Sequence, residues 1–570
     1  MSKEKQGFGD SLGRMIERIF PEGINALFAV VTSLFFACAI AFHGYLSSER
    51  ARIWMLPLAV AVLTPAFCYL QKLFTDKLPS FGPSGLRAQR EKLSWRVFAA
   101  VAGVTFALML INLLVNYPGG LDTDVLNQWN QAQTGVFNDW FPAIHSMMIR
   151  QVARVVNRYA FVIAVQMLCF SLLAGYMAAT LRAWGLRWGW VAAFAVCLLS
   201  ARVTWVMLLT PTKDVMFSML ALALAAHMVN IVFSEASWLQ KWPNRIAFAL
   251  ALAMATLVRH NGIFFTVPVL VLLCIFYMKR SAKDCVITAA MAGIMIFCVR
   301  GPLYSLARVT RDPSQTYVET VGIPMTILCS VYRTEPDRLS PEATALMQAM
   351  ATEEEWADEF IFGNYNSIKI IKSKVNPVVS TVPPGDLLRM TLQTVKAAPR
   401  ISLRAVLSLT QFVWDPATNI QDVFWIHAAD FRTAYLALLS PELPIPEEYG
   451  PYIDSIGRET LGINYSEAFA KTIGTVYSVL FMLASNKLLQ SVGIAMFALM
   501  LAGGYSLRHR RGAYALLLIA PSIVYNLGTM LLLCGPDYRF FHFNVVITVP
   551  LVLACLAKVE PEAIQPSAPL

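Results

Sequence analysis

The segment from Tyr117 to Ser146 holds the polar side chains most able to do chemistry, and it lies between two long apolar runs. Asp122 and Asp124 stand close together just after a Pro-Gly-Gly turn. A carboxylate can take a proton from a hydroxyl group, so either aspartate could be a general base. Helix capping is the alternative, because Asp is favoured at a helix N-terminus. Capping of one helix needs only one of the two aspartates, so it does not account for the other.

The second half of this segment predicts an amphipathic helix that begins after Asp139 and Pro142. Arg150, Arg154 and Arg158 are spaced by four and share one edge of that helix. Such a helix lies flat in the membrane interface, with its cations at the depth of lipid phosphates. These arginines therefore indicate either general headgroup anchoring or a specific role at a lipid phosphate.

Three other short polar turns lie between apolar runs, and each carries a cation. They are Lys213-Asp214, Arg259-His260-Asn261 and Asp537-Tyr538-Arg539, the last followed by His542. Charges near the end of a membrane span are costly unless they meet a partner or water. If these three cations lie close together in the fold, they form an anion site. The polar residues next to them in the turns could then contact substrate.

Each cation also has a simpler interpretation. Lys213 and Arg259 could be snorkelling residues at helix ends, and Arg539 could belong to a capped loop with Asp537 as its ion-pair partner. His145 and His260 could ligate a metal, but no local spacing with carboxylates supports this, so structural hydrogen bonds are favoured. Asp122, Asp124 and Asp139 could supply oxygen ligands. The sequence identifies no cofactor with certainty, and a divalent metal stays open.

The composition places these turns in a membrane protein. The chain has 570 residues, 57% hydrophobic and 14% charged, with a mean hydropathy of +0.55, which is too apolar for a water-soluble core. A membrane helix needs about 20 mostly apolar residues. About twelve runs qualify: 24–46, 53–74, 97–115, 160–181, 188–208, 215–233, 245–258, 262–278, 284–302, 488–507, 512–533 and 541–557.

The orientation follows from Lys and Arg in short loops, which stay in the cytoplasm. The basic clusters fall on one side if both termini are cytoplasmic, although Arg50 and Arg52 lie on the other. The polar turns then lie outside, and Ala470–Ala484 is expected to be an interfacial helix rather than a span. The net charge of +10 reflects this loop bias and requires no nucleic acid partner. The ten cysteines show no disulfide or zinc spacing.

The expected fold is therefore an all-α polytopic membrane protein, divided into four parts. Residues 1–96 form an N-terminal cytoplasmic segment and an added hairpin of spans. Residues 97–302 form the membrane core, including the outer loop 116–159 with its interfacial helices. Residues 303–487 form a mostly helical extracytoplasmic domain, with a helix expected at 340–351, and residues 488–570 form the C-terminal spans and a cytoplasmic tail.

Several stretches resemble the GT-C superfamily of membrane glycosyltransferases. They are "PGGLDTD", "FNDWFPAIHS", "TPTKDVMFS", "LVRHNGIFF", "VETVGIPMTIL", "FGNYNSIK" and "GPDYRFFHF", which run from the third span almost to the C-terminus. The branch of closest pattern is bacterial and largely of unassigned activity. The resemblance implies sugar transfer from a polyprenyl-phosphate donor to a cell-envelope glycan, lipid or protein, at the outer face of the bacterial cytoplasmic membrane.

The resemblance also assigns roles. It implies an inverting reaction with a first-loop aspartate as base, without choosing between Asp122 and Asp124; we favour Asp122. Lys213, Arg259 and Arg539 would bind the donor phosphate. Substrate-binding candidates are Asp139, His145, Asp214, His260, Asn261, Tyr538 and His542. A transporter or lipid-linked glycan flippase is the rival, although such proteins place ionisable residues near the bilayer middle. A glycan polymerase or ligase would share this chemistry.

Overall fold

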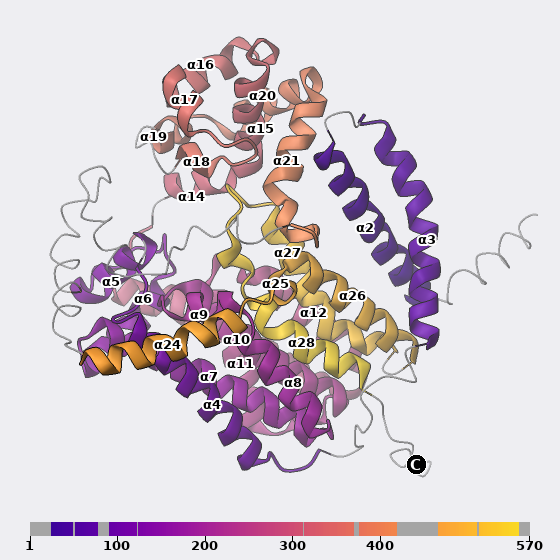
Figure 1. Ribbon diagram of the computed structural model, residues 1–570, viewed down its shortest axis with the longest axis vertical. Coiled ribbons are helices and arrows are strands. Elements are labelled where there is room, and N and C mark those ends of the chain that lie inside the picture. Colours follow the sequence, from indigo (N-terminus) through magenta and orange to yellow (C-terminus); the bar gives the residue numbers. More distant parts are fainter. Residues whose placement is uncertain are drawn as a thin grey trace, which may run out of the picture.

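The computed structural model describes residues 24–48, 52–77, 90–121, 123–311, 313–369, 375–418, 456, 466–509 and 512–557. In these ranges the chain forms helices and isolated bridges, without strands (Figure 1). The prediction of an all-α polytopic membrane fold is confirmed. Asp122, favoured above as the base, lies outside the described residues.

Every predicted apolar run overlaps a helix. These are α2 (Ile24–Ser47), α3 (Met55–Lys77), α4 (Trp95–Val115), α7 (Tyr159–Ala183), α8 (Trp188–Leu199), α9 (Arg202–Leu208), α10 (Lys213–Phe233), α11 (Trp242–Val258), α12 (Ile263–Cys298), α26 (Val492–His509), α27 (Leu516–Met530) and α28 (Phe543–Leu556). Within the described ranges, 8 helical stretches are long and apolar enough to cross a membrane, and the others are shorter. The bend of α12 at Ser281 separates two predicted spans.

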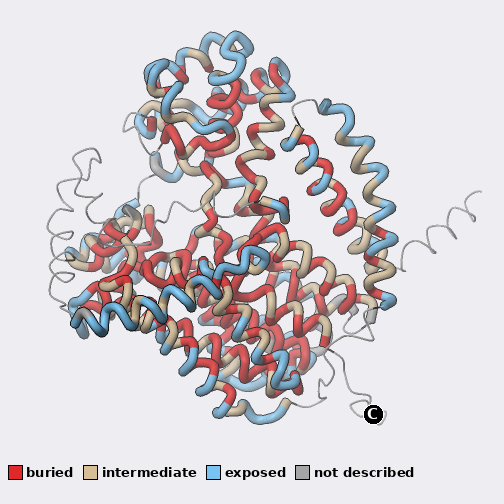
Figure 2. The backbone as a smooth tube through the Cα atoms, in the orientation of Figure 1, coloured by how far each residue is buried: buried red, intermediate tan, exposed pale blue. Residues whose placement is uncertain are grey.

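The bundle is arranged around α10. In the most apolar stretch of α10, 89% of the residues are buried. The corresponding share is 11% in α3 and 11% in the part of α12 that follows its bend. Figure 2 shows the same contrast between an inner buried bundle and outer helices with exposed faces. Because the exposed side chains on α3 are apolar, among them Leu58 and Val62, this face suits lipid rather than water.

A small helical domain lies above one end of the bundle (Figure 1). Its helices are α14 (Pro313–Thr320), α15 (Gly322–Thr334), α16 (Pro341–Met350), α17 (Glu353–Glu359), α18 (Asn366–Lys369), α19 (Val375–Ser380) and α20 (Pro384–Ala397). They share a hydrophobic core that includes Met325, Met347, Trp356 and Tyr365. The helix expected at 340–351 is confirmed as α16. Helix α21 (Pro399–Trp414) returns the chain to the bundle.

Two peripheral elements complete the described chain. The hairpin of α2 and α3 packs on α21 and α26, and Arg404 of α21 donates to the carbonyl oxygen of Leu46 at 3.1 Å. Helix α24 (Glu467–Leu483) contacts α4 and crosses it at an angle (Figure 1). Its outer face exposes apolar side chains such as Val476 and Met482, as expected of an interfacial helix.

Candidate active site

Four segments far apart in the chain bring charged side chains together at one end of the bundle. They are α5 (Thr123–Thr134), the first turn of α10, the 3-10 helix η3 (His260–Gly262) with the preceding Arg259, and the 3-10 helix η9 (Tyr538–Phe541). We call Asp124, Lys213, Asp214, Arg259, Asp537 and Arg539 the charged cluster.

Asp124 lies at the centre of the cluster, between two cations. Its Oδ2 atom is 3.3 Å from Nη1 of Arg539 and 3.7 Å from Nζ of Lys213. Burial raises the pKa of Asp124, but the positive charges of Arg539 and Lys213 outweigh this effect and hold the pKa below its usual value. Asp124 is therefore ionised at neutral pH and holds two cations near one point.

Arg539 is fixed by a second carboxylate. Its Nε and Nη2 atoms donate to Asp537 at 3.1 and 2.7 Å, and Asp537 also caps η9 by accepting from the backbone N–H of Arg539 at 3.0 Å. The capped loop considered from the sequence is thus present. The same guanidinium nevertheless reaches Asp124 with Nη1, so Arg539 both stabilises its loop and belongs to the charged cluster.

Arg259 and Asp214 form a buried ion pair beside Asp124. Thr212 caps α10 through its hydroxyl group and so sets the direction of Lys213 and Asp214. Aromatic rings support both cations. The Arg259 guanidinium lies 4.2 Å from the Phe540 ring centroid, and the Lys213 ammonium lies 4.3 Å from that of Phe141. Neither cation therefore needs to snorkel into water.

Asp139, His260 and Asn261 lie at the edge of the cluster. The Nε2 atom of His260 is 3.1 Å from the carbonyl oxygen of Asp139, and Asn261 donates to the Thr529 hydroxyl at 3.5 Å. The Asp139 carboxylate accepts at 3.2 Å from the backbone N–H of Ala143, the first residue of α6 (Ala143–Val155). His260 makes the structural hydrogen bond favoured from the sequence.

The other three substrate-binding candidates are buried beneath the cluster. His145 is hydrogen-bonded to Gln128, Tyr538 donates to the carbonyl oxygen of Gln490, and His542 Nδ1 is 3.0 Å from the Ser218 hydroxyl. These contacts join α6 (Ala143–Val155) to α5, η9 to α25 (Lys487–Gln490), and the end of η9 to α10. Among the residues that the structure describes, no group of three or more His, Cys, Asp and Glu is arranged to hold a metal ion.

The helical domain also contributes to the cluster, which sequence patterns did not indicate. Lys369 pairs with Glu319, and the charge of Lys369 acts on Asp124. The backbone N–H of Asn366 donates to the carbonyl oxygen of Cys534 at 3.0 Å. A Cβ atom on Gly322 would lie 2.1 Å from the carbonyl oxygen of Leu533. The domain therefore packs on the loop that leads to Asp537 and Arg539.

Arg150 has a structural role that its four-residue spacing from Arg154 did not indicate. Its Nη1 atom donates to the carbonyl oxygens of Ala132 and Gln133 at 2.6 and 3.0 Å, which closes the C-terminal end of α5. Arg154, in contrast, is exposed and bonds Gln151. The three arginines spaced by four therefore do not act as one unit, because Arg150 fixes α5.

No family model matches this chain, and no curated protein sequence matches it. Among solved structures, the chain is similar to the cryo-EM structure of the arabinosyltransferase EmbB from Mycobacterium smegmatis. The match has 11% identity and a TM-score of 0.30, and it covers 81% of this chain and 45% of that one. The chain thus spans less than half of that protein.

His145 makes the site region sensitive to acid. Burial, together with the charge of Lys213, lowers the pKa of His145 from 6.5 to about 3. Below pH 6.5 the unfolded histidine binds a proton and the folded one does not, so the folded state loses up to about 1.4 kcal/mol per pH unit until the pH reaches about 3. We expect the melting temperature to fall between pH 7.5 and 5.5 by more in the wild type than in His145→Gln. Equal losses in both proteins would contradict this origin.

Proposed function

We propose that this protein is a GT-C-type glycosyltransferase that transfers a sugar from a polyprenyl-phosphate donor to a cell-envelope acceptor. The observation that carries the proposal is the position of Asp124, within 3.3 Å of Arg539 and 3.7 Å of Lys213, beside Arg259 and at one end of an apolar helical bundle. Such a group of cations at a membrane surface suits a lipid-linked phosphate.

In the proposed reaction, an acceptor hydroxyl oxygen attacks the anomeric carbon of the donor sugar. The hydroxyl proton passes to an aspartate, the bond from the anomeric carbon to the phosphate oxygen breaks, and polyprenyl phosphate leaves with the electron pair. A single displacement inverts the anomeric configuration. Lys213, Arg259 and Arg539 stabilise the charge that develops on the leaving phosphate. These three cations can stabilise the phosphate without a divalent metal.

The two aspartates are assigned different tasks in this proposal. The Asp124 carboxylate interacts with both Arg539 and Lys213. Their positive charges lower the pKa of Asp124 by more than burial raises it. A carboxylate with a lower pKa is a weaker base. Asp124 therefore orients the cations that receive the donor phosphate. Asp122, two residues earlier, is proposed as the general base. Asp139, His260 and Asn261 at the edge of the cluster are proposed to contact substrate.

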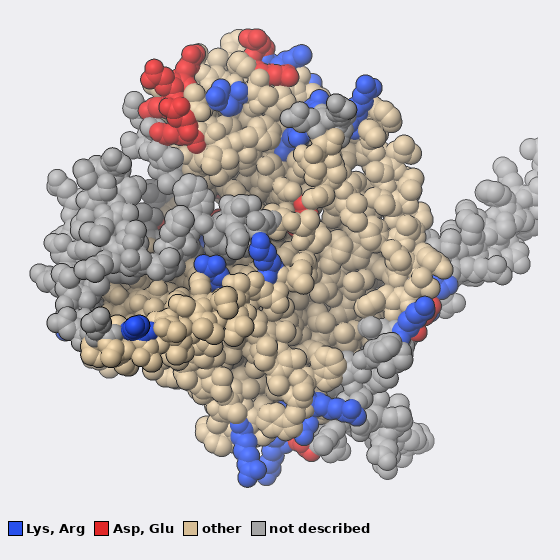
Figure 3. Space-filling model, in the orientation of Figure 1, with Lys and Arg blue, Asp and Glu red and all other residues tan. Residues whose placement is uncertain are grey.

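The proposed orientation places the cluster outside the cytoplasm. Support comes from helix ends and bends other than those that carry the cluster, where many cations lie: Lys77, Lys92, Arg96, Arg182, Arg187, Lys241, Arg245, Lys283 and Arg508. Figure 3 shows basic side chains along the lower edge of the molecule and acidic ones over α16 and α17. Cytoplasmic loops retain positive charge, so the cationic ends are assigned to the cytoplasm.

The position of the cluster favours surface chemistry over transport. Lys213 is the first residue of α10, and Arg259 directly follows the last residue of α11. Both charges thus lie at helix ends, whereas transporters place coupling charges near the bilayer midplane.

The test is transfer by the purified full-length protein in vesicles, with synthetic polyprenyl-phosphate sugars and candidate envelope acceptors. The expected result is release of polyprenyl phosphate together with a glycosylated acceptor of inverted configuration. Movement of the intact lipid-linked sugar across the vesicle membrane, without cleavage of the sugar–phosphate bond, would contradict the proposal and favour a flippase.

A further inference from the structure

A second basic site lies where α12 ends and the chain leaves the bundle. There the π-helix η4 (Val299–Leu303) and the short α13 (Tyr304–Leu306) lead to Arg311. They line an open cavity of about 530 Å³, a volume within the range of ligand sites. Its lining is Arg300, Gly301, Tyr304, Ser305, Arg308, Val309 and Arg311, which includes three arginines and no carboxylate.

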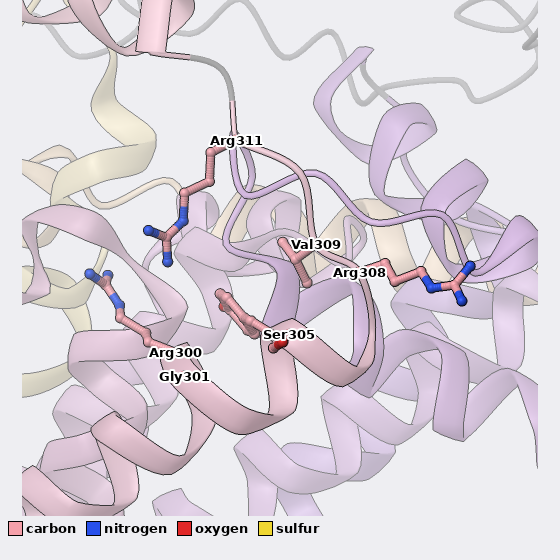
Figure 4. A pocket seen from close by; sticks show the side chains of 7 residues that line it. Arg300, Gly301, Ser305, Arg308, Val309 and Arg311 are labelled. Atoms are coloured by element: carbon pink, nitrogen blue, oxygen red, sulfur yellow. The ribbon is translucent and has the colours of Figure 1, made fainter.

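Two of these arginines are directed at the same space. Figure 4 shows the guanidinium groups of Arg300 and Arg311 facing one another across one side of the cavity, whereas Arg308 extends the other way. Arg311 has Asp139 as a partner at 3.9 Å, at the outer limit of an ion pair. The Arg311 side chain is 62% exposed, so this pair is weak.

The cavity wall is held in place by hydrogen bonds to α6 and to the loop before it. The backbone of Thr310 donates to Phe137 and accepts from Asp139, at 3.0 and 2.9 Å, and the Tyr304 hydroxyl accepts from the Ile144 backbone at 3.2 Å. A π-helical turn is itself rare and often occurs at functional sites. The two arginines therefore converge on a preorganised frame rather than on a free loop.

The surroundings of the cavity are suited to a lipid. The helical stretch that carries Arg300 exposes large apolar side chains on both sides of it, with exposed fractions of 61% for Ile294, 71% for Phe297 and 84% for Leu306. In a bilayer such a face contacts acyl chains. A phosphate held by Arg300 and Arg311 would leave its lipid tails beside these residues, as basic pockets near helix ends allow.

We propose that Arg300 and Arg311 form a second lipid-phosphate site, separate from Lys213, Arg259 and Arg539. It lies next to the charged cluster, because Asp139, the partner of Arg311, also contacts His260 through its carbonyl oxygen at 3.1 Å. The ligand is a phosphate group on a membrane lipid, either an anionic glycerophospholipid or a polyprenyl phosphate. This proposal does not require glycosyl transfer.

The test measures lipid binding to the full-length protein by native mass spectrometry, with phosphatidylglycerol, polyprenyl phosphate and inorganic phosphate as separate probes. The variant is Arg300→Gln with Arg311→Gln. Its matched control is Arg338→Gln with Arg389→Gln, which removes the same charge from two exposed arginines of the helical domain. If the double variant does not fold, Arg300→Gln alone replaces it, because its side chain is exposed.

We expect the site variant to bind one of the two lipids at least about tenfold more weakly, which is the effect of losing one charged hydrogen bond, and the control to bind as the wild type does. Loss for phosphatidylglycerol identifies a glycerophospholipid site, and loss for polyprenyl phosphate identifies a carrier site. Unchanged binding, an equal loss in the control, or equally tight binding of inorganic phosphate would overturn the proposal. Failure of the transfer assay would leave this result unaffected.

Discussion

Asp122→Asn is expected to reduce sugar transfer by at least about 100-fold, because an amide cannot take the acceptor proton and general-base catalysis contributes about 10²–10⁴-fold. The effect should fall on kcat, and the acid limb of the pH–rate profile, which reports ionisation of the base, should disappear. Asp124→Asn should instead weaken donor use, since Arg539 and Lys213 lose the carboxylate that holds them together. Steady-state rates with a polyprenyl-phosphate sugar separate the two effects.

Asp386→Asn is the matched control, because this exposed carboxylate of α20 is paired with Arg389 on the helical domain. Full activity of Asp122→Asn together with an inactive Asp124→Asn would transfer the role of base to Asp124. Full activity of both variants would remove an aspartate base from the mechanism altogether.

Arg539→Ala is expected to lower kcat/KM for the donor by about 10²–10³-fold, the usual cost of removing one group that stabilises developing negative charge. Arg539→Lys should recover only part of this loss. An ammonium keeps the charge but cannot contact Asp537 and Asp124 with three separate nitrogens, as the guanidinium does. The measurement is donor saturation at fixed acceptor concentration.

Arg404→Ala provides the comparison, because Arg404 joins α21 to the end of α2 without being part of the charged cluster. Both alanine variants should be inserted and purified in similar amounts. Donor saturation that is unchanged in Arg539→Ala would refute the assignment of this residue to the donor phosphate.

The spans of this fold are readable from the sequence, because a bilayer demands long apolar runs whatever their neighbours are. The run predicted at 188–208 nevertheless divides into α8 and α9. Arg202 donates its backbone N–H to Ala484, and its guanidinium lies over the Phe481 ring. That break depends on docking of α24, a contact between distant segments that apolarity alone does not reveal.

The site is only partly readable in the same way. Polar turns between spans identify Lys213, Arg259 and Arg539 as candidates, because a charged side chain near a membrane is costly unless it meets a partner or water. Their actual partners depend on tertiary packing. Asp214 binds Arg259 rather than its sequence neighbour. Lys369 reaches the cluster only because the helical domain packs on the loop at Leu533 and Cys534. Helical spacing likewise groups Arg150 with Arg154, although Arg150 hydrogen-bonds the carbonyl oxygen of Ala132 at the end of α5.

The contact between Asp124 and Arg539 joins residues 415 positions apart, and this separation has a consequence during biosynthesis. At about 5–20 residues per second, the ribosome finishes the second residue roughly 20 to 80 s after the first. The nascent chain therefore enters the membrane without a complete site. Any product truncated before Arg539 lacks this side chain, so that it cannot complete the charged cluster.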